Sequence, residues 1–304
     1  MSGTKLFVCC HKEDAVPKHP LLQPIQVGTA LTDRAFPGFL HDNTGENISE
    51  KNRSYCELTA QYWAWKNCDA DYYGFFHYRR YLYPKPKAKR PYRIERRPTA
   101  ECLERLGYEN FGSLIKQYDL IVPQGENMYV PVREHYACAP YHRENDLTLM
   151  ERIVREGSPE MSEALESYLS GTIHYFGNIY IMRKDVFRDY CGWLFPVLEE
   201  FDTRADFEGY SAQERRVDGY LAERLLGAYY TQRKDELRTL ELPRVHFEPN
   251  SAERIKNVMI NAILPPGSWR RSVVKAWRRS SPVILQKEGK NDHPTDCLSK
   301  GRSF

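Results

Sequence analysis

The chain has 304 residues and a mass of 35.7 kDa, with 41% hydrophobic residues, 28% charged residues and a formal net charge of +3. This length allows one large domain, or two modest ones, with ample apolar surface to bury. A net charge this small does not indicate a nucleic-acid-binding protein, so no nucleic acid partner is expected. No apolar run approaches the roughly 20 residues that span a bilayer, and the start of the chain shows no signal peptide.

The eight cysteines are scattered along the chain without a Cys-x-x-Cys pair. That distribution predicts a reduced, cytoplasmic protein without a structural zinc site.

The first predicted strand is the apolar run Lys5–Cys10, and His11 and Lys12 follow directly after it. Ligands of open α/β sheets bind beyond the carboxyl ends of the strands. His11 and Lys12 are therefore candidate nucleotide contacts, although an ordinary solvated turn would look the same.

A loop rich in small polar residues follows a second predicted strand, residues 24–31. Asp42, Asn43, Asn47 and Asn52 stand out in it. The loop leads to a predicted helix that begins at about Ser54, because Ser54 and Glu57 have the spacing of a capping box.

Residues 72–82 read as one strand, with His77 and Arg79 on one face and Tyr78 and Arg80 on the other. A histidine and two arginines at the end of an apolar strand need water, a counter-charge or a ligand. The cluster predicts an anion site, and the alternative is a surface strand whose arginines extend into solvent.

Further along, strand and helix patterns continue to alternate. Residues 174–182 form a predicted strand that contains Asn178, an amide expected to make a specific hydrogen bond. Residues 215–232 form a predicted helix with Glu223 and Arg224 near its start, for which a solvent-facing ion pair is the alternative. The alternation indicates a single α/β domain with a mainly parallel sheet flanked by helices.

The last part of the chain differs in composition. Residues 1–248 are expected to form the α/β domain, and residues 249–304 a basic C-terminal extension. After a break at residues 264–268, basic and apolar residues interleave up to Arg279. This segment suits an interfacial helix on an anionic membrane surface, and a solvated terminal helix is equally compatible with it.

Five linked motifs resemble one known family. They are NISEKNRSYCELTAQYWAWKN, YYGFFHYRRYL, YDLIVPQ, FGNIYIMRKDVFRDYCGWLF and RVDGYLAERLL, and with their flanks they span residues 5–243. In this order they resemble the bacterial capsular and exopolysaccharide glycosyltransferases of domain of unknown function 4422.

That resemblance implies a GT-A-like fold with a nucleotide-sugar donor across the carboxyl ends of a Rossmann-type sheet. His11 and Lys12 would contact the nucleotide, and the loop that carries Asp42, Asn43, Asn47 and Asn52 would contact sugar or ribose. His77 and Tyr78 would complete the donor site.

Arg79 and Arg80 fall where many GT-A enzymes carry an Asp-x-Asp metal motif. Bidentate guanidinium groups can neutralise a leaving diphosphate without a metal, so Mn²⁺ or Mg²⁺ is optional. A literal Asp69-Ala70-Asp71 precedes the strand and is a weak alternative metal site. Glu223 would be the catalytic base, with Asp218 in reserve. Asn178 and Arg224 would contact the acceptor.

The expected reaction moves a hexosyl unit, with galactofuranosyl as a candidate, from a UDP-sugar to a polyprenyl-diphosphate-linked glycan. It would serve capsular, exo- or O-antigen polysaccharide synthesis at the inner face of the cell membrane. Two rival classes are a nucleotide-sugar hydrolase or pyrophosphorylase and a non-catalytic glycan-binding assembly protein.

Overall fold

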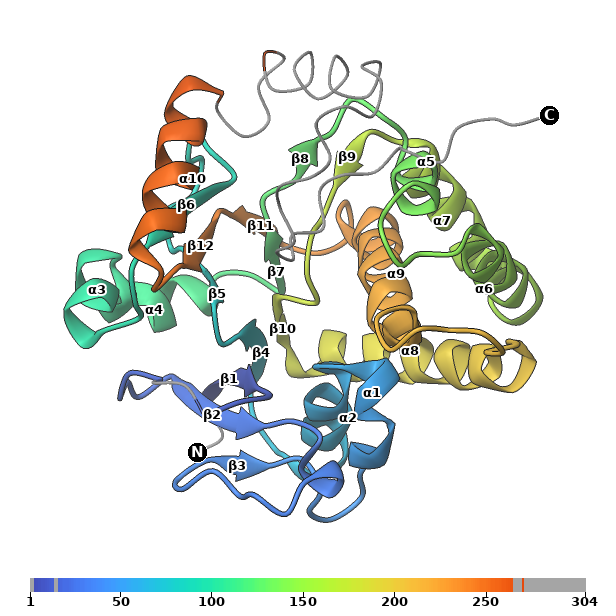
Figure 1. Ribbon diagram of the computed structural model, residues 1–304, viewed down its shortest axis with the longest axis horizontal. Coiled ribbons are helices and arrows are strands. Elements are labelled where there is room, and N and C mark those ends of the chain that lie inside the picture. The colour runs from blue at the N-terminus through green and yellow to red at the C-terminus, as the bar shows by residue number, and fades with distance from the viewer. Residues whose placement is uncertain (1–2, 14–15, 265–269, 271–304) are drawn as a thin grey trace.

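A large mixed sheet forms the centre of the computed structural model, which describes residues 3–13, 16–264 and 270 (Figure 1). Its strand order is β11-β7-β10-β4-β1-β2-β3, and β5, β6 and β12 join it at one side through β4. The strands of this sheet are β1 (Thr4–Cys10), β2 (Leu22–Gln26), β3 (Leu40–His41), β4 (Tyr72–His77), β5 (Arg80–Leu82), β6 (Tyr92–Glu95), β7 (Leu120–Pro123), β10 (Tyr180–Arg183), β11 (Thr239–Leu242) and β12 (Arg244–Phe247). A separate pair consists of β8 (Glu126–Asn127) and β9 (Ile173–His174).

The α-helices of the described residues are α1 (Asn52–Tyr55), α2 (Leu58–Asn67), α3 (Ala100–Arg105), α4 (Phe111–Ile115), α5 (Val132–Ala137), α6 (Glu144–Gly157), α7 (Pro159–Ser170), α8 (Lys184–Arg204), α9 (Val217–Arg233) and α10 (Ser251–Ile263).

The centre of the sheet is parallel: β1 pairs with β2 on one side and with β4 on the other. β10 then runs antiparallel between β4 and β7. The parallel pairs bring the carboxyl ends of β1, β2 and β4 to the same edge. The predicted α/β class with a mainly parallel sheet is confirmed.

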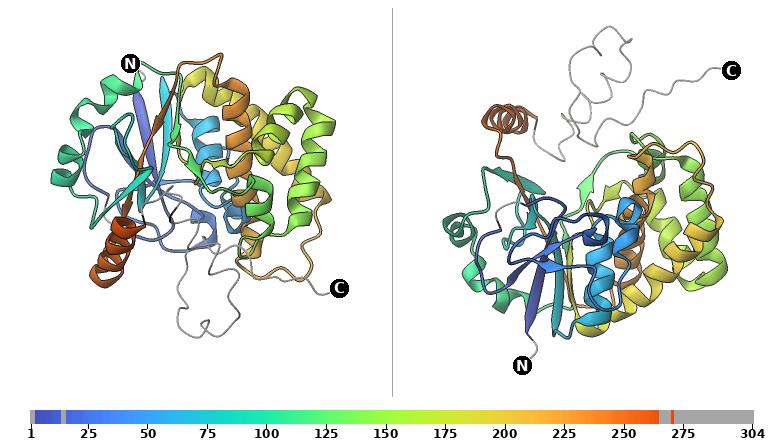
Figure 2. Two further views of the ribbon diagram at one scale, coloured as in Figure 1. Left: turned by 90° about the horizontal axis from the view of Figure 1, so that it is seen from above. Right: turned by 60° about the horizontal axis from the view of Figure 1, so that its bottom comes forward.

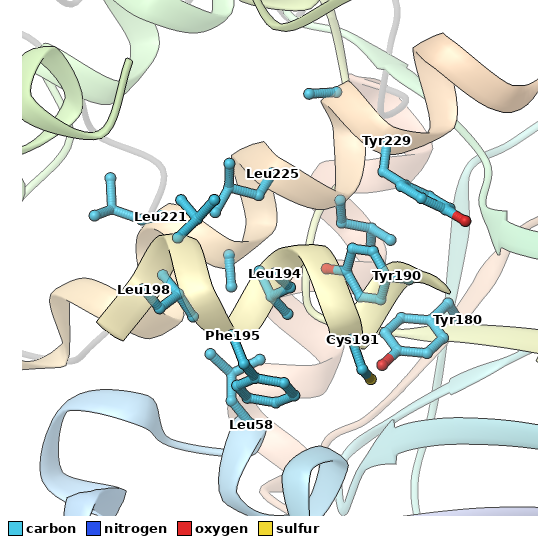
Figure 3. Close-up of a cluster of buried hydrophobic side chains, with 14 of the residues drawn as sticks. Leu58, Tyr180, Tyr190, Cys191, Leu194, Phe195, Leu198, Leu221, Leu225 and Tyr229 are labelled. Carbon is cyan, nitrogen blue, oxygen red and sulfur yellow. The ribbon is translucent and has the colours of Figure 1, made fainter. Parts of the chain in front are cut away.

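Alternate residues of β1 enter two different hydrophobic cores. Phe7 and Cys9 pack with α2, α8 and α9, while Leu6 and Val8 pack on the face that α3 and α4 cover. Figure 2 shows the sheet between these two helical layers, with α6 and α7 as an outer layer beside α8 and α9. Figure 3 shows the larger core, where α8 packs on α9 through aliphatic and aromatic side chains.

Two predicted strands are each split in the structure. Residues 72–82 form β4 and β5, which reverse direction at a tight turn through Tyr78 and Arg79. Residues 174–182 form the end of β9 and most of β10, with a bend between them that holds Asn178. The alternation of side chains therefore does not run through either segment.

The predicted helix at Ser54 is also interrupted. Cys56 has a left-handed backbone (φ 51°), which separates α1 from α2. Ser54 and Glu57 consequently do not form a capping box: the Ser54 hydroxyl donates to the carboxylate of Asp218, and the Glu57 carboxylate accepts from Asn178. The break directs Glu57 towards the carboxyl edge of the sheet.

The proposed boundary at residue 248 falls between β12 and α10. Apart from Arg270, the basic segment after Pro265 lies outside the described residues. None of the helices described is both long enough and apolar enough to cross a membrane.

Candidate functional site

The ends of β1 and β4 bring four of the predicted donor-site residues together. The ring centroids of His11 and Tyr78 are 4.9 Å apart, and those of His11 and His77 are 6.2 Å apart. The Lys12 Nζ and the Arg79 guanidinium each lie 5.2 Å from the Tyr78 ring centroid. The parallel pairing of β1 with β4 explains this meeting, because Cys9, the residue before the strand's last, pairs with His77.

The turn after β4 changes the predicted facing of the basic residues. His77 pairs with Arg80 across the antiparallel β4–β5 connection, and directly opposed residues project to the same face. The prediction that His77 shares a face with Arg79 through a continuous strand is therefore wrong. Arg79 lies in the turn, where its backbone N–H donates to the Nδ1 of His77 at 3.3 Å. Its own Nε is buried without a hydrogen bond inside the described part of the chain.

The surroundings of His77 are strongly cationic. Burial lowers the pKa of His77 well below its usual range, and the charges of Arg80, His11, Arg216 and Arg79 lower it further. His77 is therefore neutral at physiological pH, with Nδ1 as acceptor and Nε2–H as donor. A neutral donor surrounded by guanidinium groups is a suitable partner for phosphate oxygens.

Arg216 is a member of this cluster that the sequence analysis did not single out. It lies in the 3₁₀ turn before α9, and its Nε donates to the Cys56 sulfur at 3.3 Å. The available signal was its place in the RVDGYLAERLL motif, but helical spacing could not show that it faces His77. Arg216 adds a third guanidinium to those of Arg79 and Arg80.

Two carboxylates approach the cationic cluster from the helical side. Burial raises the pKa of Glu223, the charge of Arg224 lowers it, and Glu57, Arg80 and Arg244 also act on it. Glu57 and Glu223 likewise act on Arg80, whose pKa burial lowers. We call Glu57, Glu223 and Arg80 one electrostatic unit, because they are close enough for their charges to interact. Sequence reasoning had treated Glu57 as a helix cap and missed it as a site residue.

Asn178 connects the two carboxylate-bearing elements. Its Nδ2 donates to the Glu57 carboxylate at 2.8 Å and to the carbonyl of Gly219, four residues before Glu223 on α9, at 3.1 Å. Asn178 is 3% exposed, and its Oδ1 is buried without a hydrogen bond in the region described. The expected specific hydrogen bond exists, and it fixes Glu57 against α9.

Arg224 and Arg244 are buried arginines whose charges act on Glu223. Arg224 is 4% exposed, contacts Glu223 at 2.8 Å and lies over the Tyr136 ring. Arg244 forms a buried ion pair with Glu126. The position of Arg224 assigns it to orienting Glu223, and it offers little surface to an acceptor.

The polar loop after β3 is held mainly by its own hydrogen bonds. Asp42 is fully buried, and its carboxylate accepts from the backbone N–H groups of Gly28 and Thr29 and from the hydroxyls of Ser49 and Thr59, at 2.6–3.0 Å. Four donors satisfy the carboxylate. Asp42 therefore fixes the loop beside β2.

Two of the three predicted asparagines in this loop are also engaged internally. Asn52 donates to the carbonyl of Cys56 at 2.6 Å, and Asn47 closes a local turn with Gly45 and Ser49. Of the four loop residues predicted to contact the donor, Asn43 alone is exposed.

The literal Asp69-Ala70-Asp71 lies before β4, at the opposite edge of the sheet. The Asp69 carboxylate pairs with Lys184, which lowers its pKa. Among the residues that the structure describes, no cluster of three or more His, Cys, Asp and Glu side chains could hold a metal ion.

The structure is thus an α/β sheet with a parallel centre, and its carboxyl edge gathers arginines, a neutral histidine and two carboxylates. The family model of a domain of unknown function, DUF4422, matches residues 5–234, and the chain belongs to this family. No curated protein matches the chain.

Among solved structures, the chain is similar to the apo structure of the WbbM bifunctional glycosyltransferase. The sequences are 32% identical, the TM-score is 0.76, and the match covers 81% of this chain. It covers 45% of the WbbM chain, so this chain spans less than half the length of that protein. The likeness confirms the GT-A-like fold.

Proposed function

We propose that the protein is a glycosyltransferase that uses a UDP-sugar donor. The single observation behind this proposal is the gathering of Arg79, Arg80 and Arg216 around the neutral His77 at the carboxyl edge of β4. A nucleoside diphosphate carries the complementary charge. His11 and Lys12, which follow β1, extend the same edge and would hold the nucleotide.

The arginines would stabilise the leaving diphosphate as the glycosidic bond to it breaks. Charge develops on that group in the transition state, and preorganised donors in a partly buried site are most effective there. Arg79 and Arg80 would take the role that a divalent cation has in metal-dependent enzymes, since planar guanidinium groups bind phosphate oxygens in pairs. Mn²⁺ or Mg²⁺ is therefore not required in this proposal.

Glu223 would remove the proton from the acceptor hydroxyl. Its burial raises its pKa, which makes it a stronger base than an exposed glutamate. Arg224 would hold Glu223 in place. Asn178 would hold Glu57 against α9 through its hydrogen bonds to Glu57 and to the carbonyl of Gly219. Asn178 is as buried as Arg224, so it would position Glu57 and would not contact the acceptor directly.

The proposed acceptor is a polyprenyl-diphosphate-linked glycan, and the transferred unit is a hexosyl group with galactofuranosyl as the first candidate. Capsular, exo- or O-antigen polysaccharide synthesis would be the setting. The enzyme would work as a peripheral protein on the inner face of the cell membrane, held there by its basic C-terminal extension.

A nucleotide-sugar screen tests the proposal. Thermal stabilisation by UDP-sugars, measured with and without EDTA, should identify a donor whose effect survives the chelator, because a ligand of the folded state raises the melting temperature. Release of UDP that depends on added acceptor supports a transferase. Free sugar without acceptor would identify a hydrolase, and full function of the Arg79→Ala, Arg80→Ala variant would identify a non-catalytic binding protein.

A further inference from the structure

Helix α10 contacts the rest of the domain through hydrogen bonds of two amide side chains. The Asn257 Nδ2 donates to the Glu248 carboxylate at 3.0 Å, and the Asn261 Oδ1 accepts from the Tyr92 hydroxyl at 3.3 Å. Asn261 is 8% exposed. A helix that stabilises a globular domain normally buries an apolar stripe and exposes its amides. In α10 two amides take inward positions beside the half-buried Ile260, while four other apolar residues are exposed.

The outer side of α10 is aliphatic. Ile255, Val258, Met259 and Ile263 are exposed by 54%, 47%, 60% and 69%. Their spacing of three, four and eight residues from Ile255 puts them on one face of the helix. Figure 2 shows this helix at the periphery of the molecule, beyond β6 and β12. An aligned, exposed apolar face of this kind marks an interaction surface.

The charges on α10 and in the sequence that follows it select its partner. α10 carries Glu253, Arg254 and Lys256, and residues 254–279 of the sequence contain seven Lys and Arg and no Asp or Glu. Apolar residues flanked by basic ones suit the headgroup region of an anionic bilayer. A symmetric contact between two copies would instead bring the same positive charges together.

The position of α10 relative to the cationic edge gives this surface a role. The Phe247 N–H donates to the carbonyl of Arg79 at 2.8 Å, and His246 pairs with Arg80. α10 begins four residues after Phe247. A membrane contact at α10 would therefore hold the Arg79–Arg80 turn close to the lipid surface.

We propose that α10 is a membrane-docking helix that inserts Ile255, Val258, Met259 and Ile263 into the interface of an anionic bilayer. The docking serves the proposed function by presenting the edge to an acceptor diphosphate anchored in lipid. The proposed membrane contact is made by α10 itself and is distinct from any contact by the basic segment after Pro265.

The test is flotation of the full-length protein with vesicles of phosphatidylcholine, with and without phosphatidylglycerol. We expect binding to the anionic vesicles, and we expect the Ile255→Ser, Met259→Ser variant to need about tenfold more lipid for half-binding. The reason is that interfacial binding scales with inserted apolar area. A matched control, Leu31→Ser with Leu40→Ser, removes two exposed leucines elsewhere and should bind like the wild type.

Equal vesicle binding by the wild type and the α10 variant would overturn the proposal. So would a wild-type protein that ignores both kinds of vesicle, or one that is a dimer in light scattering and becomes a monomer in the α10 variant. UDP release with a lipid-free acceptor is measured on the same samples. Unchanged release with lost flotation supports docking, whereas absent release in every sample counts against the transferase and leaves the flotation result valid.

Discussion

The two ends of strand β4 carry opposite charges in opposite surroundings. Before the strand, Asp69 and Asp71 lie on the exposed edge, and Asp69 pairs with Lys184. After the strand, His77, Arg79 and Arg80 are partly buried, and other cationic groups surround them. An exposed ion pair contributes little free energy, whereas partly buried charges need a counter-charge, hydrogen bonds or a ligand.

β4 thus has a sequence motif at its amino end and a cluster of basic residues without a known motif at its carboxyl end. Asp-x-Asp has the letters of a metal-binding motif but stands at the amino edge of the sheet, whereas ligands of open α/β sheets bind beyond the carboxyl ends of the strands. The arginines have no such motif, yet they stand at the carboxyl edge. The following variants set one end of the strand against the other.

The largest expected effect is at the carboxyl end of β4. The Arg79→Ala, Arg80→Ala variant should lower kcat/KM for transfer by about 10³-fold, because it removes the donors that stabilise the leaving diphosphate. Steady-state UDP release measures this loss. The control variant Arg152→Ala, Arg155→Ala removes two exposed arginines from α6 and should keep wild-type activity. Wild-type kcat/KM in the first variant would remove the arginines from catalysis.

Glu223→Gln should lower kcat by about 10²-fold or more while changing the KM for donor little, because an amide cannot accept the acceptor's proton. The Glu57→Gln variant tests the neighbouring carboxylate of the same electrostatic unit. If Glu57→Gln loses more kcat than Glu223→Gln, the base is Glu57 and the assignment to Glu223 is wrong.

Substitutions at the amino end of β4 should change the transfer activity very little. The Asp69→Asn, Asp71→Asn variant should keep transfer activity within about twofold of the wild type, because loss of an exposed ion pair has a small effect. The same assay in EDTA should give the same rate. A rate restored by Mn²⁺ in wild type and lost in this variant would show that the literal motif holds the metal after all.

The alternation of apolar runs predicted the sheet class, and the family resemblance implied one donor site for His11, Lys12 and His77, which the structure brings close together. Sequence reasoning failed where backbone reversals interrupt a run. The turn at Tyr78 and Arg79 and the left-handed Cys56 leave almost no periodic signal. Such breaks depend on tertiary contacts that a local pattern does not contain.

The loop after β3 shows a second limit. Its composition suggests ligand contacts. The Asp42 carboxylate, however, already accepts hydrogen bonds from Gly28 and Thr29 after β2, from Ser49, and from Thr59 of α2. Arg216 and Glu57 show the converse, because their roles depend on helix packing across the sheet edge. Residue type predicted polarity correctly in both cases, and only the fold shows which polar groups face inward.

Asp218 tests the electrostatics under the carboxyl edge with the smallest expected effect. It is fully buried and accepts from the Ser54 hydroxyl, and burial together with the charge of Asp202 raises its pKa from 3.8 to about 8. In the unfolded chain the carboxyl ionises near its ordinary pKa, so between about pH 4 and pH 8 the folded state binds more protons than the unfolded state. Its contribution to the free energy of unfolding is therefore complete below about pH 4 and is lost as the pH rises to about 8.

Asp218→Asn should remove this dependence, because the amide keeps an acceptor for Ser54 and does not titrate. We expect its melting temperature to match the wild type near pH 4 and to exceed it increasingly as the pH rises to about 8. Thermal denaturation across this pH range measures the difference. Parallel melting curves at every pH would mean that Asp218 ionises normally in the folded protein. A transfer rate that collapses in this variant, with Glu223→Gln active, would make Asp218 the base.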